Sequence, residues 1–124
     1  MLDINEAKKF VKENNIKNIS TSQIRKFLYA VNKINNKVMY KNDDETLSDD
    51  IIDEIAYMRV QFAYIFGKNV DKHKQRIKKL YEKFDPVINN IIEKRSTIDF
   101  INFARYVEAI IAYHKFYGGD NNGE

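Results

Sequence analysis

The feature that most constrains the fold is the scarcity of residues that interrupt helices. The chain of 124 residues contains one proline, Pro86, and four glycines, at positions 67, 118, 119 and 123. No Asn-Gly pair separates two alternating apolar runs, so β-hairpins are not indicated. Apolar residues instead recur three and four positions apart, which predicts amphipathic helices. We therefore expect an all-α fold: a compact single-domain bundle of five to six helices over residues 1–117, followed by a polar, disordered tail over 118–124.

Capping residues divide the chain into helices. The first predicted helix covers residues 3–14, the second begins after a cap at residue 20 or 21, and the third runs from a cap at residue 48 to residue 67. The fourth covers residues 71–84, and a short fifth helix begins at residue 86. The last helix begins after a cap at residue 96 or 97 and ends at residue 117. Ser48 is an N-cap candidate because its hydroxyl can accept a hydrogen bond from the first turn. Asp85 followed by Pro86 predicts a break, with Asp85 as cap and Pro86 at the first helical position. Gly118 can adopt the left-handed conformation that ends a helix.

The apolar stripes of these helices give the expected core. Its members are Ile4, Ala7, Phe10 and Val11; Ile24, Phe27, Leu28, Val31, Ile34 and Val38; Ile51, Ile55, Met58, Phe62, Ile65 and Phe66; Ile77, Leu80, Tyr81 and Phe84; Val87, Ile88, Ile91 and Ile92; and Phe103, Val107, Ile110, Ile111 and His114. Each set follows the helical repeat, so each helix has one face to bury against the others.

Charge is distributed unevenly, although the net charge is only +3. Residues 43–54 contain seven acidic and no basic side chains, whereas residues 68–83 contain seven Lys and Arg against two acidic side chains. We expect an acidic end and a basic face. Lys72, Arg76, Lys79 and Lys83 follow one another at helical spacing, and such a stripe either follows nucleic-acid phosphates or is an ordinary solvated face.

The residues needed for catalysis are sparse. The chain has no cysteine, so it can form no disulfide, thiolate metal site or cysteine nucleophile. His73 and His114 have no zinc-ligand spacing, and His114 on an apolar face is better explained as a core residue. The acidic run 43–54 is better explained as a loop and a helix N-terminus than as a metal site. We expect no catalytic site, metal or cofactor. No signal peptide or membrane span is indicated, so a cytoplasmic location is expected.

Several cations border the predicted buried faces. Arg25 and Lys26 adjoin Ile24, and Arg59 and Arg105 have corresponding edge positions on two later helices. Arginines at such edges either contact a ligand or pair with Asp or Glu of a neighbouring helix, and the sequence leaves both roles open.

Three stretches together resemble one known family. They are residues 19–28 (ISTSQIRKFL), 57–68 (YMRVQFAYIFGK) and 103–119 (FARYVEAIIAYHKFYGG). Their order and spacing are similar to those of the small-subunit family of type III-A CRISPR effector complexes, the Csm complexes. The resemblance spans about residues 19–119.

This resemblance implies a helical, non-catalytic subunit of which several copies stack into a filament. The filament would line the channel for CRISPR RNA and target RNA, and would touch the RNA-cleaving backbone subunits and the Cas10-type large subunit. Self-association is implied, including a homodimer of the isolated protein, with no membrane contact. The motif positions expected to contact RNA or other subunits are Arg25, Lys26, Arg59, Lys68, Arg105 and Lys115. Lys72, Arg76 and Lys79 join them only through the charge stripe. Contacts to phosphate and 2′-hydroxyl would suit any guide sequence, because they carry no base information.

Two other functions remain open. The chain could be a helical spacer whose acidic and basic ends bind other subunits without touching RNA. It could also be a small RNA-processing enzyme, which would require His73 and His114 to act in cleavage.

Overall fold

The chain folds into helices throughout the part that the structure describes. The computed structural model describes residues 3–14, 16, 21–41, 45–67 and 74–118, and for 65–67 and 74–77 the backbone alone. The elements are a 3₁₀ turn η1 (Ile4–Glu6), α1 (Ala7–Glu13), α2 (Thr21–Val38), α3 (Asp49–Gly67), α4 (Lys74–Lys94) and α5 (Thr97–Phe116). No strand occurs in these residues, and Thr46 and Ser96 form an isolated β-bridge. The predicted all-α class is confirmed. None of the described helices is long and apolar enough to cross a membrane.

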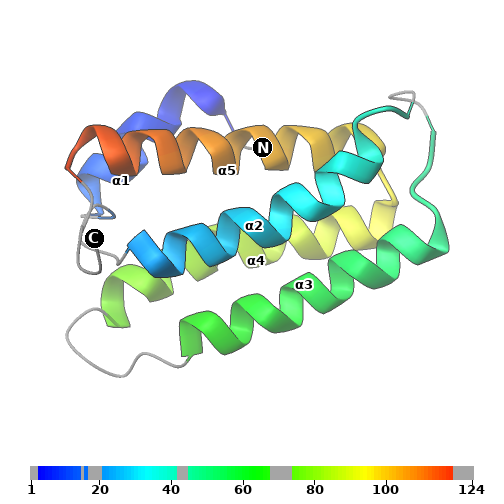
Figure 1. The fold of residues 1–124 in the computed structure, drawn as a ribbon, viewed down its shortest axis with the longest axis horizontal. Coiled ribbons are helices and arrows are strands. Elements are labelled where there is room, and N and C mark those ends of the chain that lie inside the picture. The colour runs from blue at the N-terminus through cyan, green and yellow to red at the C-terminus, as the bar shows by residue number, and fades with distance from the viewer. Residues whose placement is uncertain (1–2, 15, 17–20, 42–44, 68–73, 119–124) are drawn as a thin grey trace.

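The four long helices run along the long axis of the molecule, and α1 lies beside α5 (Figure 1). Helix α5 packs against α1, α2 and α4, and α3 packs against α2 and α4. Helix α5 is therefore buried over much of its surface, including Phe103, Val107, Ile110 and His114. This matches the predicted stripe, and Arg105 and Lys115 lie off it as expected.

Aromatic rings join the helices at the centre of a single buried cluster. The ring of Phe27 on α2 lies 4.2 Å from that of Phe62 on α3 and 5.2 Å from that of Phe84 on α4, centroid to centroid. Phe84 also meets Phe103 and Tyr106 of α5 edge-on, at 5.5 and 5.8 Å. Such offset and edge-to-face pairs add to the stabilisation from burial alone.

The predicted caps at Ser48, Ser96 and Gly118 are present, whereas Asp85 lies inside a helix and caps none. The backbone N–H of Ile51 donates to the Ser48 hydroxyl at 3.3 Å, and that of Asp99 donates to the Ser96 hydroxyl at 3.1 Å. Gly118 follows α5 with φ +76°, the left-handed conformation. Ser20, the other proposed start of α2, and the tail beyond 118 lie outside the described residues.

The segment before α3 is anchored to the turn between α4 and α5. Leu47 is buried, and its backbone N–H donates to the Arg95 carbonyl at 3.0 Å. The Arg95 guanidinium donates to Asp49 at 2.6 Å, and the Thr97 hydroxyl donates to the Glu45 carbonyl. These contacts connect the acidic end of α3 to the α4–α5 turn.

Two expectations were wrong. Residues 85 and 86 do not separate two helices, because α4 continues from Lys74 to Lys94 with Pro86 inside it. Leu80, Phe84, Ile88 and Ile91 form one buried stripe across that point, so the helix continues although proline removes the hydrogen bond to the residue 82 carbonyl. Residues 82 and 86 are both exposed, so the interrupted hydrogen bond lies on the solvent side of α4.

The second error concerns Ile4, which was assigned to the core and is 47% exposed. It lies in the 3₁₀ turn ahead of α1, whose tighter winding directs side chains differently from a continuing α-helix. The other expected core residues with described side chains are buried or pack against the buried cluster. Side chains 65, 66 and 77 lie outside the description.

Candidate nucleic-acid interface

The exposed face of α2 carries a group of cations. The helix buries Ile24, Phe27, Val31, Ile34 and Val38, and its opposite side faces solvent. Arg25, Lys26 and Lys33 are exposed there. None of these three forms an ion pair with a described residue. We call them the α2 cations.

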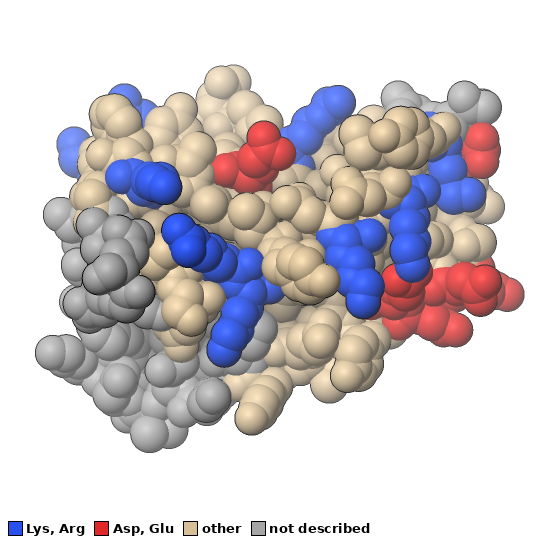
Figure 2. All heavy atoms as spheres, in the orientation of Figure 1, with Lys and Arg blue, Asp and Glu red and all other residues tan. Residues whose placement is uncertain are grey.

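Lys37, one turn further along α2, differs because its ammonium donates to Glu54 of α3 at 2.8 and 3.0 Å. Figure 2 shows Lys and Arg side chains spread along the face that α2 occupies, with acidic side chains gathered near the start of α3. Asp49, Asp50 and Asp53 are exposed at that end. The described residues therefore show the expected acidic end. Helix α2 contributes the exposed cations Arg25, Lys26 and Lys33, whereas the basic face was expected from residues 68–83, of which the side chains of 68–77 lie outside the described residues.

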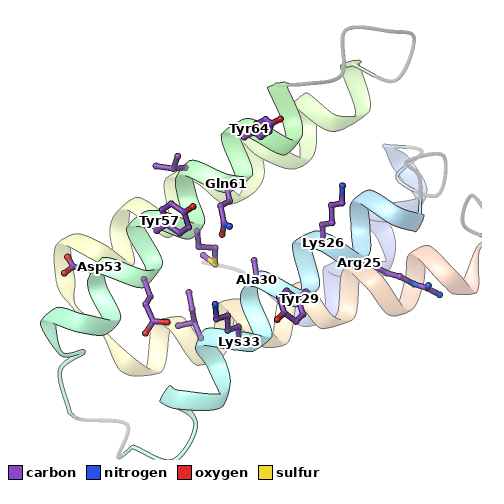
Figure 3. A pocket seen from close by; sticks show the side chains of 13 residues that line it. Arg25, Lys26, Tyr29, Ala30, Lys33, Asp53, Tyr57, Gln61 and Tyr64 are labelled. Atoms are coloured by element: carbon purple, nitrogen blue, oxygen red, sulfur yellow. The ribbon is translucent and has the colours of Figure 1, made fainter. Parts of the chain in front are cut away.

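A groove of about 880 Å³ opens between α2 and α3. Its lining residues are Arg25, Lys26, Tyr29, Ala30, Lys33 and Ile34 from α2, and Asp53, Glu54, Tyr57, Met58, Val60, Gln61 and Tyr64 from α3 (Figure 3). Tyr29, Tyr57 and Tyr64 are 71%, 65% and 64% exposed, and they share the lining with both apolar and charged side chains. Groups of exposed large apolar side chains on a small protein commonly mark binding surfaces.

Arg59 has the structural role that the sequence left open. Its Nε and Nη2 donate to the two carboxylate oxygens of Asp85 at 2.7 and 3.0 Å, and its Nη1 donates to the Asn89 side chain at 2.9 Å. This bidentate pair connects α3 to α4. The hydrogen bonds from Arg59 lower the pKa of the Asp85 carboxyl, and the same pairing raises the pKa of Arg59. Because three of its N–H groups donate to Asp85 and Asn89, the guanidinium is held in place within the protein.

Replacement of Arg59 with alanine is expected to reduce stability by about 1–3 kcal/mol, because the partly buried Asp85 would lose a charged partner. Urea unfolding of the variant would measure this change. Arg105→Ala is the matched control: Arg105 is exposed on α5, so its loss should change stability by less than about 0.5 kcal/mol. Equal effects of the two substitutions would contradict the structural role of Arg59.

Lys83 belongs to the predicted basic stripe but takes part in a partly exposed network that connects α4 to the N-terminal turn and α5. Its ammonium donates to Glu6 at 2.7 Å, and the Tyr106 hydroxyl donates to the same carboxylate oxygen at 2.9 Å. The ammonium also lies over the rings of Phe10 and Tyr106, at 5.3 and 5.7 Å from their centroids. The hydrogen bonds from Lys83 and Tyr106 lower the pKa of Glu6, and burial, followed by the bond to Glu6, raises the pKa of Tyr106.

These two carboxylates predict a loss of stability in acid. Glu6 and Asp85 have lower pKa values in the folded protein than when unperturbed, so the unfolded chain binds more protons at low pH. The stabilisation from Glu6 and Asp85 is fully present above about pH 4.3, and it is lost as the pH falls through the pKa values of these two carboxyls in the folded protein. Urea unfolding at a series of pH values would show the decline. In Asp85→Asn the stability at neutral pH should be lower and the acid-dependent decline smaller, whereas an unchanged decline would contradict the assignment.

Of the remaining cations predicted to contact RNA, some have described side chains and others do not. Lys79, Arg105 and Lys115 are exposed and form no ion pair with a described residue. The side chains of Lys68, Lys72 and Arg76 lie outside the described residues, and the basic stripe stays a prediction. His114 is buried, as expected for a core histidine, and His73 is not described. The described residues contain no group of three His, Cys, Asp or Glu side chains arranged to hold a metal ion.

The sequence interpretation missed the groove itself. Four lining residues were not among the predicted site residues: Lys33, Tyr29, Tyr57 and Tyr64. Tyr57 and Tyr64 lie within the second family motif, residues 57–68. Tyr57 and Tyr64 are seven positions apart, two helical turns, and lie off the stripe of Ile55, Met58 and Phe62. Tyrosines repeated on the polar side of a helix were the available signal.

Comparison with known proteins identifies the family. The family model described as Csm2 Type III-A matches residues 2–120. A protein of Enterococcus italicus named "CRISPR system Cms protein Csm2" is 34% identical over 130 residues, covering 94% of this chain and 90% of that protein. A protein of the same name from Streptococcus thermophilus is 35% identical over 101 residues, covering 82% of this chain and 74% of that protein. The match of nearly the whole chain, together with the helical fold, confirms the resemblance: the chain belongs to the Csm2 family, the small subunits of type III-A CRISPR systems.

Proposed function

We propose that this chain is a non-catalytic subunit of a type III-A RNA-guided effector complex in the cytoplasm. Several copies stack along the complex, beside the RNA-cleaving backbone subunits and the Cas10-type large subunit. The exposed face of α2 lies along the channel that holds guide RNA and target RNA. In this position the protein helps to retain target RNA during antiviral defence.

The α2 cations are the observation that supports this proposal most directly. Arg25, Lys26 and Lys33 are exposed on one helix and form no ion pair with a described residue, so each can neutralise a phosphate. Arg25 and Lys26 also lie in the first quoted family motif. Arg59 does not line the groove, but its ion pair with Asp85 connects α3 to α4 and so helps to hold α3 in position beside α2.

Binding of target RNA by the assembled complex tests the role of the α2 cations. The complex is reconstituted with guide RNA, and its dissociation constant for complementary RNA is measured across a salt series. The variant carries Arg25→Ala, Lys26→Ala and Lys33→Ala. We expect weaker binding and a shallower salt dependence, by about one unit of the logarithmic slope for each lost phosphate contact.

The matched control carries Lys8→Ala, Lys9→Ala and Lys12→Ala on α1. It removes the same three positive charges from exposed positions on a different helix. The control should retain the salt slope of the unmodified complex. Equal binding by all three complexes, with normal assembly, would contradict an RNA-contacting role and favour a spacer that binds only other subunits.

A further inference from the structure

The groove between α2 and α3 has features that phosphate contacts alone do not require. Its floor includes Ile34 and Met58, which belong to the buried core, while its sides present the rings of Tyr29 and Tyr57. A ring that is about two-thirds exposed keeps at least part of its π-face available to another planar group. Tyrosine offers such a face at low conformational cost, and nucleobases stack on it without regard to sequence.

Positive charge borders the same groove. Lys26 and Lys33 on the α2 side are exposed, and neither forms an ion pair with a described residue. Lys26 and Lys33 are seven positions apart, which corresponds to about 10 Å along the helix. Of the acidic residues in the lining, Glu54 is occupied by Lys37, and Asp53 lies toward the end of the groove away from Lys26 (Figure 3). With Glu54 paired to Lys37, the lining has the three cations Arg25, Lys26 and Lys33 against the one carboxylate of Asp53, so its net charge is complementary to a polyanion.

Gln61 adds hydrogen-bonding capacity between the aromatic side chains. It lies on α3 between Tyr57 and Tyr64 and points into the space between the two helices (Figure 3). A primary amide both donates and accepts, so it can bond to the edge of any nucleobase. Aromatic face, amide and ammonium groups together match the three parts of one nucleotide: base face, base edge and phosphate.

We propose that the α2–α3 groove binds an unstacked base of single-stranded RNA, with Tyr29 and Tyr57 as stacking surfaces, Gln61 at the base edge, and Lys26 and Lys33 at the flanking phosphates. This inference rests on the proposed function, which places RNA along α2. The occupant is an unpaired nucleotide, because bases inside an A-form duplex have both faces covered by their neighbours. The groove volume of about 880 Å³ is within the range of small-ligand sites.

The test compares RNA strands of equal charge. The full-length protein is titrated with a short single-stranded RNA, with the same strand containing abasic residues at its centre, and with the corresponding duplex. Stacking of one base should make the intact strand bind roughly 5- to 150-fold more tightly than the abasic strand. The double variant Tyr29→Leu, Tyr57→Leu should lose this preference and keep the salt slope. Tyr29→Phe with Tyr57→Phe should restore it, because phenylalanine retains the ring.

A control substitution and the alternative outcomes separate this inference from the proposed function. Tyr40→Leu changes a tyrosine that is 86% exposed and does not line the groove, so it should leave the preference intact. If intact and abasic strands bind equally and with the same salt slope, base binding is wrong while phosphate binding along α2 stands. If no strand binds at any salt concentration and the assembled complex is insensitive to the α2 cations, both are wrong. If the leucine variants bind RNA normally but lose self-association, the groove is a contact between copies and the inference is overturned.

Discussion

Replacement of Ile110 with aspartate is expected to unfold the protein. Ile110 is completely buried on α5, the helix that packs against α1, α2 and α4. A carboxylate at this position would lose its hydration within an apolar cluster, at a cost of several kcal/mol even if it became protonated. Because small domains have total stabilities of only about 5–15 kcal/mol, this cost removes most or all of the margin. Circular dichroism should show loss of helix in the absence of denaturant.

Ala112→Asp provides the matched control for Ile110→Asp. Ala112 is exposed two positions further along the same helix, so the same carboxylate would remain in water. It should cost about 1 kcal/mol or less, from lower helix propensity and proximity to the helix C-terminus. A folded Ile110→Asp protein with a normal urea midpoint would show that the assigned inner face of α5 is wrong.

The helical stripes could be predicted because they depend on neighbours in sequence. A repeat of three and four residues indicates which face of α2 is apolar, and Ile24, Phe27, Val31, Ile34 and Val38 are all buried. Caps are equally local, since Ser48 and Ser96 bond to N–H groups three residues away. The same reliance on neighbouring residues wrongly predicted a helix break at Pro86. There the proline signal was outweighed by the continuous stripe of α4 packed on the core.

The candidate site depends on pairings that local patterns cannot reveal. Arg59 was placed correctly at the edge of a buried face, but its partner Asp85 is 26 positions away and had been assigned to a helix cap. Lys83 extended the predicted basic stripe, whereas its ammonium and the Tyr106 hydroxyl both donate to one carboxylate oxygen of Glu6, which lies 77 and 100 positions away in sequence. Arg25 and Lys26 could be selected because they lie next to a core residue within a recognised motif. The groove required the packing of α2 on α3, which the sequence did not supply.

Replacement of Phe84 with alanine is expected to reduce stability by about 3–5 kcal/mol, the range for truncation of a buried aromatic ring. Phe84 is completely buried and is the ring through which α4 meets both α2 and α5. Removing it leaves a cavity beside Phe27, Phe103 and Tyr106, and also removes their ring–ring contacts. Equilibrium urea unfolding would measure the loss. Phe84→Leu should cost clearly less, because leucine fills part of the cavity while lacking the aromatic edge and face.

Phe116→Ala is the corresponding control, since it makes the same chemical change at a ring on α5 that is 68% exposed. Its nearest aromatic neighbour is Tyr117 at 5.1 Å, and Lys8 lies 5.4 Å from its centroid, so only peripheral contacts are lost. We expect a cost of about 1 kcal/mol or less. Helix α4 also carries Asp85, which binds Arg59 of α3. If Phe84→Ala loosens α4, α3 should lose this support and be displaced. We therefore expect the variant to retain RNA less well. If Phe84→Ala matched Phe116→Ala in stability, the junction of α2, α4 and α5 would have to be held by contacts other than this ring.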